Sequence, residues 1–198
     1  MAFTAIFGGT FNPFHIGHYE MLEELQNDER IEKILVMPDS LPPHKTCDYL
    51  ADGADRIEMC RIAAEDFSKA ELCLIEFERE GRSYSYDTVV QLKQIYPDKR
   101  FTFVCGGDMI VTLDRWYNYR ELIKEIPFIA FKRNDTDGEL FEQRVEQFRR
   151  DGADITVFGR KITAVSSTYI RSNITNSQNL IPEKIYRYIE QRGIYLGK

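Results

Sequence analysis

Short apolar runs alternate with amphipathic runs along almost the whole chain, and this alternation limits the possible folds more than any other feature. The apolar runs are typical of strands, and the runs between them have the spacing of amphipathic helices. Strands that alternate with helices need crossover connections, so we predict an α/β fold with a doubly wound, mainly parallel sheet. The expected strands cover residues 3–7, 34–37, 72–77, 101–105, 128–131 and 155–158, and the expected helices cover roughly 16–27, 55–67, 86–95, 109–124 and 138–150.

The chain's length of 198 residues suits one domain with a sizeable core, or one domain with a small accessory lobe. From about residue 167 the pattern is helical, and Pro182 and Glu183 are expected to open the last helix. We predict a single domain over 1–198, with a small helical C-terminal part packed on it. The expected buried positions of that part are Ile185, Tyr188, Ile189 and Tyr195.

Charge and cysteine usage exclude several classes of protein. A net charge of −6 argues against a general nucleic-acid binder, although a local site for a small anion can exist on an acidic protein. The first basic residue is Arg30 and no long apolar run occurs, so we expect no signal peptide and no membrane span. Cys47, Cys60, Cys73 and Cys105 show no C-x-x-C spacing, which favours reduced thiols in the cytoplasm.

A glycine turn and two histidines follow the first apolar run. Gly8 and Gly9 stand between that run and the helical pattern that begins near Ile16, which places His15 and His18 at the start of the helix. A helix N-terminus presents unpaired N–H groups and a partial positive charge. The segment is therefore a natural site for an anion such as a phosphate.

Other interpretations of the two histidines remain open. They could be ordinary capping side chains that face solvent, or a zinc pair on one helix face, although no nearby acid or thiol offers a third ligand. We propose no metal-ligating residues. Thr10 and Asn12, which lie just before them, favour phosphate, because phosphate sites need donors that converge on one spot.

A second segment of this kind lies far along the chain, at residues 166–171 (Ser-Ser-Thr-Tyr-Ile-Arg). Ser167 is a suitable helix cap, which would put Arg171 in the first turn, where a cation opposes the helix dipole by about 0.3–1 kcal/mol. A bound anion would make a cation at this position favourable. The alternative interpretation is that Arg171 is an ordinary surface arginine. His44 and Lys45 form a small basic cluster on a long loop, either a clamp over a second phosphate or a solvated loop.

A third cluster follows the fourth expected strand. Gly106 and Asp108 lie just past its carboxyl end, where ligands bind in sheets of this kind, and Asp108 could meet ribose hydroxyls or a hydrated metal ion. Trp116 is the only tryptophan, and its helical spacing also fits a core position. Upstream, Ser85 or Asp87 could cap a polar helix start.

Together these segments resemble the nucleotidyltransferase superfamily, with its motifs H-x-G-H (residues 15–18) and S-S-T-x-I-R (residues 166–171). Within it the chain is similar, over nearly its full length, to the bacterial nicotinate-nucleotide adenylyltransferase family. Phe14 stands where the family usually has proline, and Ser85 stands where threonine is common. Ser85 keeps the hydroxyl, so its departure puts only the packing of the pocket around Ser85 in doubt.

The resemblance implies a Rossmann-like nucleotidyltransferase fold and transfer of the adenylyl group of ATP to nicotinate mononucleotide, with Mg²⁺ as cofactor. The implied partners are these two substrates, without nucleic acid or membrane, and the oligomeric state, including a homodimer, is left open. A nucleotide sensor without turnover is the alternative from another class. The implied catalytic residues are His15, His18 and Arg171; those for ATP are Gly8, Gly9, Thr10, Phe11, Gly106, Asp108, Ser166, Ser167 and Thr168; those for the mononucleotide are Lys45, Ser85, Thr88, Trp116 and Tyr117.

Overall fold

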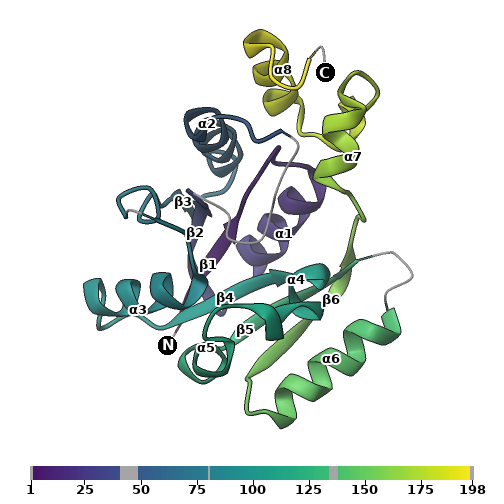
Figure 1. Ribbon diagram of the computed structural model, residues 1–198. Coiled ribbons are helices and arrows are strands. Elements are labelled where there is room, and N and C mark those ends of the chain that lie inside the picture. The colour runs from purple at the N-terminus through teal and green to yellow at the C-terminus, as the bar shows by residue number, and fades with distance from the viewer. Residues whose placement is uncertain (1, 41–48, 80, 134–137, 197–198) are drawn as a thin grey trace.

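A computed structural model describes residues 2–40, 49–79, 81–133 and 138–196 (Figure 1). Within them lies a six-stranded sheet in the order β3-β2-β1-β4-β5-β6, and every neighbouring pair of strands is parallel. The winding reverses between β1 and β4, and ligands bind beyond the carboxyl ends of the strands at such a switch point. The strands are β1 (Phe3–Gly9), β2 (Ile31–Pro38), β3 (Ala70–Leu72), β4 (Phe101–Gly106), β5 (Phe128–Arg133) and β6 (Ile155–Ile162).

Helices cover both faces of this sheet, as the α/β prediction requires (Figure 1). The α-helices are α1 (Ile16–Asn27), α2 (Gly53–Ala64), α3 (Ser85–Ile95), α4 (Gly107–Val111), α5 (Tyr119–Glu125), α6 (Gly138–Arg150), α7 (Ser167–Ser172) and α8 (Glu183–Arg192). Short 3-10 turns lie at η1 (Leu113–Arg115), η2 (Ile174–Asn176) and η3 (Gln178–Leu180).

Each face of the sheet has its own apolar core. Ala5 and Phe7 of β1 pack with α1, α2, α7 and α8, whereas Ile6 between them packs with α3, α5 and α6 on the other face. Successive strand residues point to opposite faces, so a strand covered on both sides must be apolar throughout. This is why the central strands read as continuous apolar runs.

The third strand differs from the prediction. We expected it at residues 72–77, but β3 ends at Leu72 and a turn follows, in which the Phe77 N–H donates to the Leu74 carbonyl at 2.8 Å. Ile75 and Glu76 of this turn are nevertheless buried. The apolar run therefore marks a buried segment, and its burial is reached in a turn without strand pairing.

The helix expected over residues 109–124 is also interrupted, and α4, η1 and α5 take its place. The Thr112 hydroxyl donates to the Asp108 carbonyl at 3.0 Å, a side-chain bond that competes with helical pairing. Asn118, before α5, has the left-handed backbone φ of 50°. The first break has a local side-chain bond and the second a left-handed backbone conformation, and the apolar spacing reveals neither.

The C-terminal part follows its prediction, with Ile185, Ile189 and Tyr195 buried and Tyr188 partly buried in the core that α1 and α2 share. No helix in the described ranges is long and apolar enough to cross a membrane.

Candidate active site

A cleft of about 710 Å³ opens at the carboxyl ends of β1 and β4, at the switch point of the sheet. It brings together nearly all the predicted site residues. Thr88 does not line it, and Lys45, with the rest of its basic cluster, lies outside the described residues. The predicted residues that line it are Gly8, Gly9, Thr10, Phe11, His15, His18, Ser85, Gly106, Asp108, Trp116, Tyr117, Ser166, Ser167, Thr168 and Arg171.

His15 and His18 form a stacked pair at the start of α1. His15 is the N-cap, and its Nδ1 accepts from the His18 N–H at 3.4 Å, while the His15 N–H donates to the His18 Nδ1 at 3.3 Å. The ring centroids lie 3.6 Å apart. Because each Nδ1 accepts a backbone N–H, this bonding places the proton of each neutral imidazole on Nε2. Both rings are thereby set as Nε2–H donors, the form that a phosphate oxygen requires.

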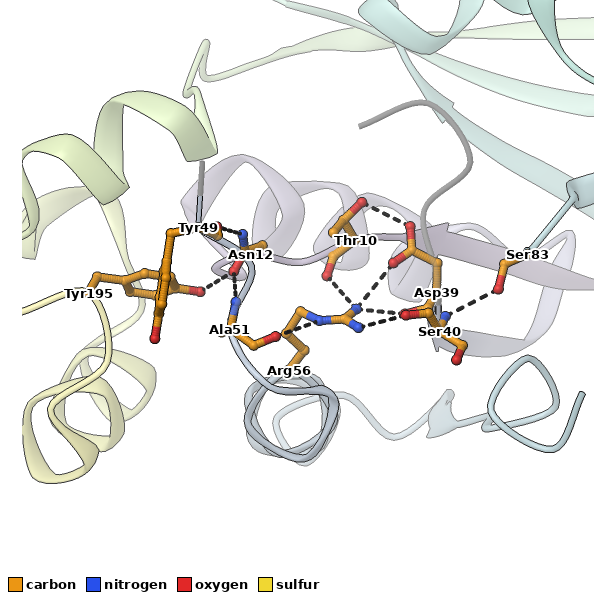
Figure 2. A network of polar contacts seen from close by, with 9 residues as sticks. All are labelled: Thr10, Asn12, Asp39, Ser40, Tyr49, Ala51, Arg56, Ser83 and Tyr195. Carbon is orange, nitrogen blue, oxygen red and sulfur yellow. Dashed lines mark hydrogen bonds and ion pairs between the residues drawn. The ribbon is translucent and has the colours of Figure 1, made fainter. Parts of the chain in front are cut away.

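The loop between β1 and α1 is held by its own polar side chains. The Thr10 hydroxyl donates to Asp39 Oδ2 at 2.9 Å. The Asn12 amide donates to the Tyr49 carbonyl at 2.8 Å, and Asn12 Oδ1 accepts from the Ala51 N–H at 3.1 Å (Figure 2). In the structure both side chains fix the shape of the loop, and a phosphate contact by Thr10 stays a prediction.

Arg56, on α2, is the centre of this network and is 1% exposed. Its guanidinium donates to the carbonyls of Thr10, Asp39, Ser40 and Ala51 and forms an ion pair of 3.1 Å with the Asp39 carboxylate (Figure 2). We predicted no role for Arg56, because its partners come from three other segments. Its sequence signal is an arginine at a position where the helix faces the core.

The α7 segment differs in register from the prediction. Ser166, not Ser167, is the N-cap, and its Oγ accepts from the Tyr169 N–H at 3.4 Å. Because α7 ends at Ser172, Arg171 lies in its last turn, where a cation is favourable, so the expected conflict with the helix dipole is wrong. Its guanidinium donates to the Asn12 carbonyl at 2.9 Å and to the Thr168 hydroxyl at 3.2 Å.

We therefore expect Arg171→Ala to lower the stability of the unliganded protein by about 1–3 kcal/mol, through loss of the charged hydrogen bond to Asn12. If Arg171 also contacts phosphates, ATP binding should weaken at least about tenfold. Thermal midpoints with and without ATP and Mg²⁺ measure both effects. Arg187→Ala, on the exposed part of α8, is the matched control and should keep the full ATP-induced shift. A full shift in Arg171→Ala would contradict the phosphate contact.

An aromatic end of the cleft lies at the start of α3. Tyr84 is the N-cap residue of α3 without a side-chain cap, so the expected caps, Ser85 and Asp87, do not fill that role. The ring of Tyr117 packs on that of Tyr84 at 4.6 Å. Trp116 is partly buried against Phe103 of β4, with ring centroids 5.8 Å apart, and also lines the cleft. It therefore combines a packing role with a surface open to a ligand.

Thr88 lies beneath this end rather than in it. It is 1% exposed, its hydroxyl donates to Glu76 Oε1 at 2.7 Å, and Arg79 donates to that hydroxyl at 3.1 Å. Glu76 itself lines the cleft, and burial raises the pKa of its carboxyl above the ordinary value. We did not predict Glu76 as a site residue, because it falls in the run that we expected to form the third strand.

A polar and charged part of the cleft lies at the carboxyl ends of β4 and β5. Asp108 Oδ1 and the Arg133 guanidinium form an ion pair of 3.2 Å, and both residues line the cleft together with Arg115. Arg133 ends β5, beside β4, so its place at the switch point could have been inferred from the strand order but not from a motif. Among the described residues, no group of three or more His, Cys, Asp or Glu side chains could hold a metal ion.

These features define a nucleotide-binding α/β protein: a switch-point cleft, paired Nε2–H donors at a helix start, and arginines that face the same space. Comparison with known proteins supports this class. The profile of the Cytidylyltransferase-like family matches residues 6–173. Nicotinate-nucleotide adenylyltransferase from Bacillus subtilis is 38% identical over 197 residues, covering 96% of each chain.

Further relatives agree. A Listeria monocytogenes protein named "Probable nicotinate-nucleotide adenylyltransferase" is 35% identical over 190 residues, covering 96% of this chain and 95% of its own. The structure of Plasmodium falciparum nicotinic acid mononucleotide adenylyltransferase complexed with NaAD superposes with a TM-score of 0.78 at 21% identity, covering 98% of each chain, which shows the shared fold. The chain belongs to the cytidylyltransferase-like nucleotidyltransferases and, within them, to the nicotinate-nucleotide adenylyltransferase family.

Proposed function

We propose that this protein transfers the adenylyl group of ATP to nicotinate mononucleotide, giving deamido-NAD and pyrophosphate, in NAD biosynthesis in the cytoplasm. One observation carries the proposal: a single cleft joins a donor-rich end, formed by α1 and α7, to an aromatic end, formed by Trp116, Tyr117 and the start of α3. The names of the family's curated members support the choice of substrates.

At the donor-rich end the protein positions the triphosphate and stabilises its charge. The Nε2–H groups of His15 and His18 donate to phosphate oxygens, with His18 nearest the reacting α-phosphate, and Arg171 and the start of α7 hold the β- and γ-phosphates. The mononucleotide phosphate attacks the α-phosphorus in line, and pyrophosphate leaves, without a covalent enzyme intermediate. Catalysis of this kind depends on orientation and on donors placed where charge develops.

At the aromatic end the pyridine ring stacks on Trp116. Its carboxylate meets the Ser85 hydroxyl and the N–H groups of the first turn of α3, which no side chain caps. Helix N–H groups without a cap are donors that suit an anion. Asp108 and Gly106 contact the adenosine or a ribose.

Mg²⁺ fits this site as a companion of the triphosphate rather than as a metal held by a protein cage. Of the carboxylates that line the cleft, Asp39 is paired with Arg56 and Glu76 is buried with a bond from Thr88, which leaves Asp108 as the more exposed one. Mg²⁺ commonly keeps several waters and binds through one or two carboxylates and substrate phosphates. When bound, it neutralises phosphate charge as the pyrophosphate leaves.

Release of pyrophosphate from a mixture of the protein, ATP, Mg²⁺ and nicotinate mononucleotide tests the function. A panel of other acceptors, including nicotinamide mononucleotide and pantetheine phosphate, tests the substrate. Nucleotide binding without pyrophosphate release from any acceptor would favour the sensor and contradict the enzyme.

We expect the acid acceptor to be preferred over its amide, nicotinamide mononucleotide, by about 10²-fold in kcat/KM. The acid's full charge strengthens its bonds to the donors around Ser85, whereas the amide's NH₂ leaves at least one donor unpaired, at about 1–3 kcal/mol. Ser85→Ala should lower the ratio of kcat/KM for the acid to kcat/KM for the amide. Trp116→Ala is the matched control, because stacking does not distinguish the two acceptors and both activities should fall together. Equal kcat/KM values in the wild type would refute the proposed substrate.

A further inference from the structure

The segment that follows α8 reaches the loop between β1 and α1, which leads to the His15–His18 pair. After α8, Gly193 and Tyr195 both adopt left-handed backbone conformations, with φ of 65° and 63°. For Tyr195 this conformation is unfavourable and persists only when its surroundings fix it. Tyr195 is 3% exposed, and its ring packs edge-on against Tyr49 at 5.4 Å.

The Tyr195 hydroxyl donates to Asn12 Oδ1 at 2.6 Å, across 183 positions of sequence (Figure 2). Burial raises the pKa of this phenol well above its ordinary value, so the group stays a neutral donor throughout the physiological pH range. Asn12 Oδ1 also accepts from the Ala51 N–H, and the Asn12 amide donates to the Tyr49 carbonyl. The three bonds fix the side chain of Asn12 from two segments, residues 49–51 and the segment that follows α8.

Asn12 in turn is bound to Arg171 through its main chain. Its carbonyl accepts from the Arg171 guanidinium at 2.9 Å, and Ser167 Oγ donates to the neighbouring carbonyl of Pro13 at 3.5 Å. His15 follows three residues after Asn12, at the cap of α1. The position of Asn12 therefore affects the position of Arg171, a predicted phosphate ligand. It also affects the start of α1, the helix that carries the histidine pair.

We propose that Tyr195 is a positioning residue for adenylyl transfer, which acts through Asn12 on Arg171 and on the His15–His18 pair without touching a substrate. This proposal rests on the proposed function and adds a residue to it. The Tyr195 hydroxyl bonds to this loop and not to a group of the C-terminal segment itself. Small displacements of donors around a reacting phosphate lower turnover, so the bond should matter to catalysis as well as to stability.

The test compares Tyr195→Phe with Tyr188→Phe, which are matched changes in the same C-terminal part. Tyr188 donates to Asp55 Oδ1 at 2.7 Å on α2, and Tyr188 and Asp55 do not line the cleft. Each variant loses one hydroxyl: Tyr195→Phe loses the bond to Asn12, and Tyr188→Phe loses the bond to Asp55 and the contact with Arg192. We measure the thermal midpoint, kcat, KM for both substrates, and ATP–Mg²⁺ affinity by calorimetry.

Tyr195→Phe should lower kcat and ATP affinity by about 3–10-fold, the value of one hydrogen bond, with little change in KM for the mononucleotide. Tyr188→Phe should leave all of these within twofold at a similar loss of thermal midpoint. Equal kinetics in the two variants would overturn the proposal. If the wild type releases no pyrophosphate, the proposed function fails, and the ATP affinities alone still decide the role of Tyr195.

A double-mutant cycle tests the route. In an Arg171→Ala background the effect of Tyr195→Phe on ATP affinity should shrink, because the bond from Arg171 to Asn12 is already absent. Additive effects would contradict a route through Arg171.

Discussion

Replacing Arg56 with methionine is expected to destabilise the folded protein by about 3–5 kcal/mol. The substitution keeps the bulk of the side chain but leaves the Asp39 carboxylate without its ion pair and removes the donor from the Thr10, Ser40 and Ala51 carbonyls. Removing one partner of such a pair costs this much, because the Asp39 charge stays partly buried without its counter-ion and three carbonyls lose their donor. The thermal midpoint should fall by roughly 6–20 °C.

Arg61→Met is the matched control. It lies on the same helix α2, and its ion pairs with Glu58 and Glu65 are exposed. Exposed pairs contribute little to stability, so this variant should melt close to the wild type. Similar midpoints for Arg56→Met and Arg61→Met would show that the network around Arg56 does not hold the fold.

Arg56→Met should also affect the site, at temperatures where this variant remains folded. Arg56 bonds to the loop after β1 and to the residues after β2, and Ser40 N–H donates onward to Ser83 Oγ at 3.2 Å, just before α3. Both ends of the cleft are therefore linked to one guanidinium (Figure 2). We expect kcat/KM to fall for both acceptors alike, as measured at 20 °C, whereas loss at one acceptor alone would contradict this link.

Arg56 also shows what sequence reasoning could not supply. The strand order places β1 beside β4, and both glycine segments that we singled out at strand ends do meet there. These inferences rested on periodicity and on local motifs, which are properties of short windows. The partners of Arg56 lie 5 to 46 positions away, and no window contains them. Long-range polar bonds of this kind follow from the tertiary fold, so they become visible only with it.

The errors at the site have a similar origin. Ser166 and Ser167 are equally good helix caps by residue type. Only the extended backbone of Ser166, which precedes the first helical residue, decides between them. Arg171 lies in the last turn rather than the predicted first one mainly because α7 ends at Ser172, after only six residues. Asn12 has the right chemistry for a phosphate donor, but Tyr49, Ala51 and Tyr195 use its side chain. Residue type thus limits the possible roles, and competition among neighbours selects one.

The largest effect on activity is expected at His18. His18→Ala should lower kcat by about 10²–10³-fold at saturating substrates, the usual effect of removing one donor to developing charge. It should also cost about 0.5–2 kcal/mol of stability, because the Nδ1 that accepts the His15 N–H is lost from the capping box of α1.

His18→Asn separates these two effects. The asparagine Oδ1 can accept the His15 N–H from nearly the position of Nδ1, but the side chain is too short to replace the Nε2–H donor. We therefore expect the thermal midpoint of His18→Asn to return toward that of the wild type while kcat stays low. If His18→Asn restored both the thermal midpoint and kcat, His18 would act through the cap of α1 alone. If His18→Ala kept the wild-type kcat, no donor at this position would serve the reaction, and the stacked pair would be a structural cap whose only task is to begin the helix.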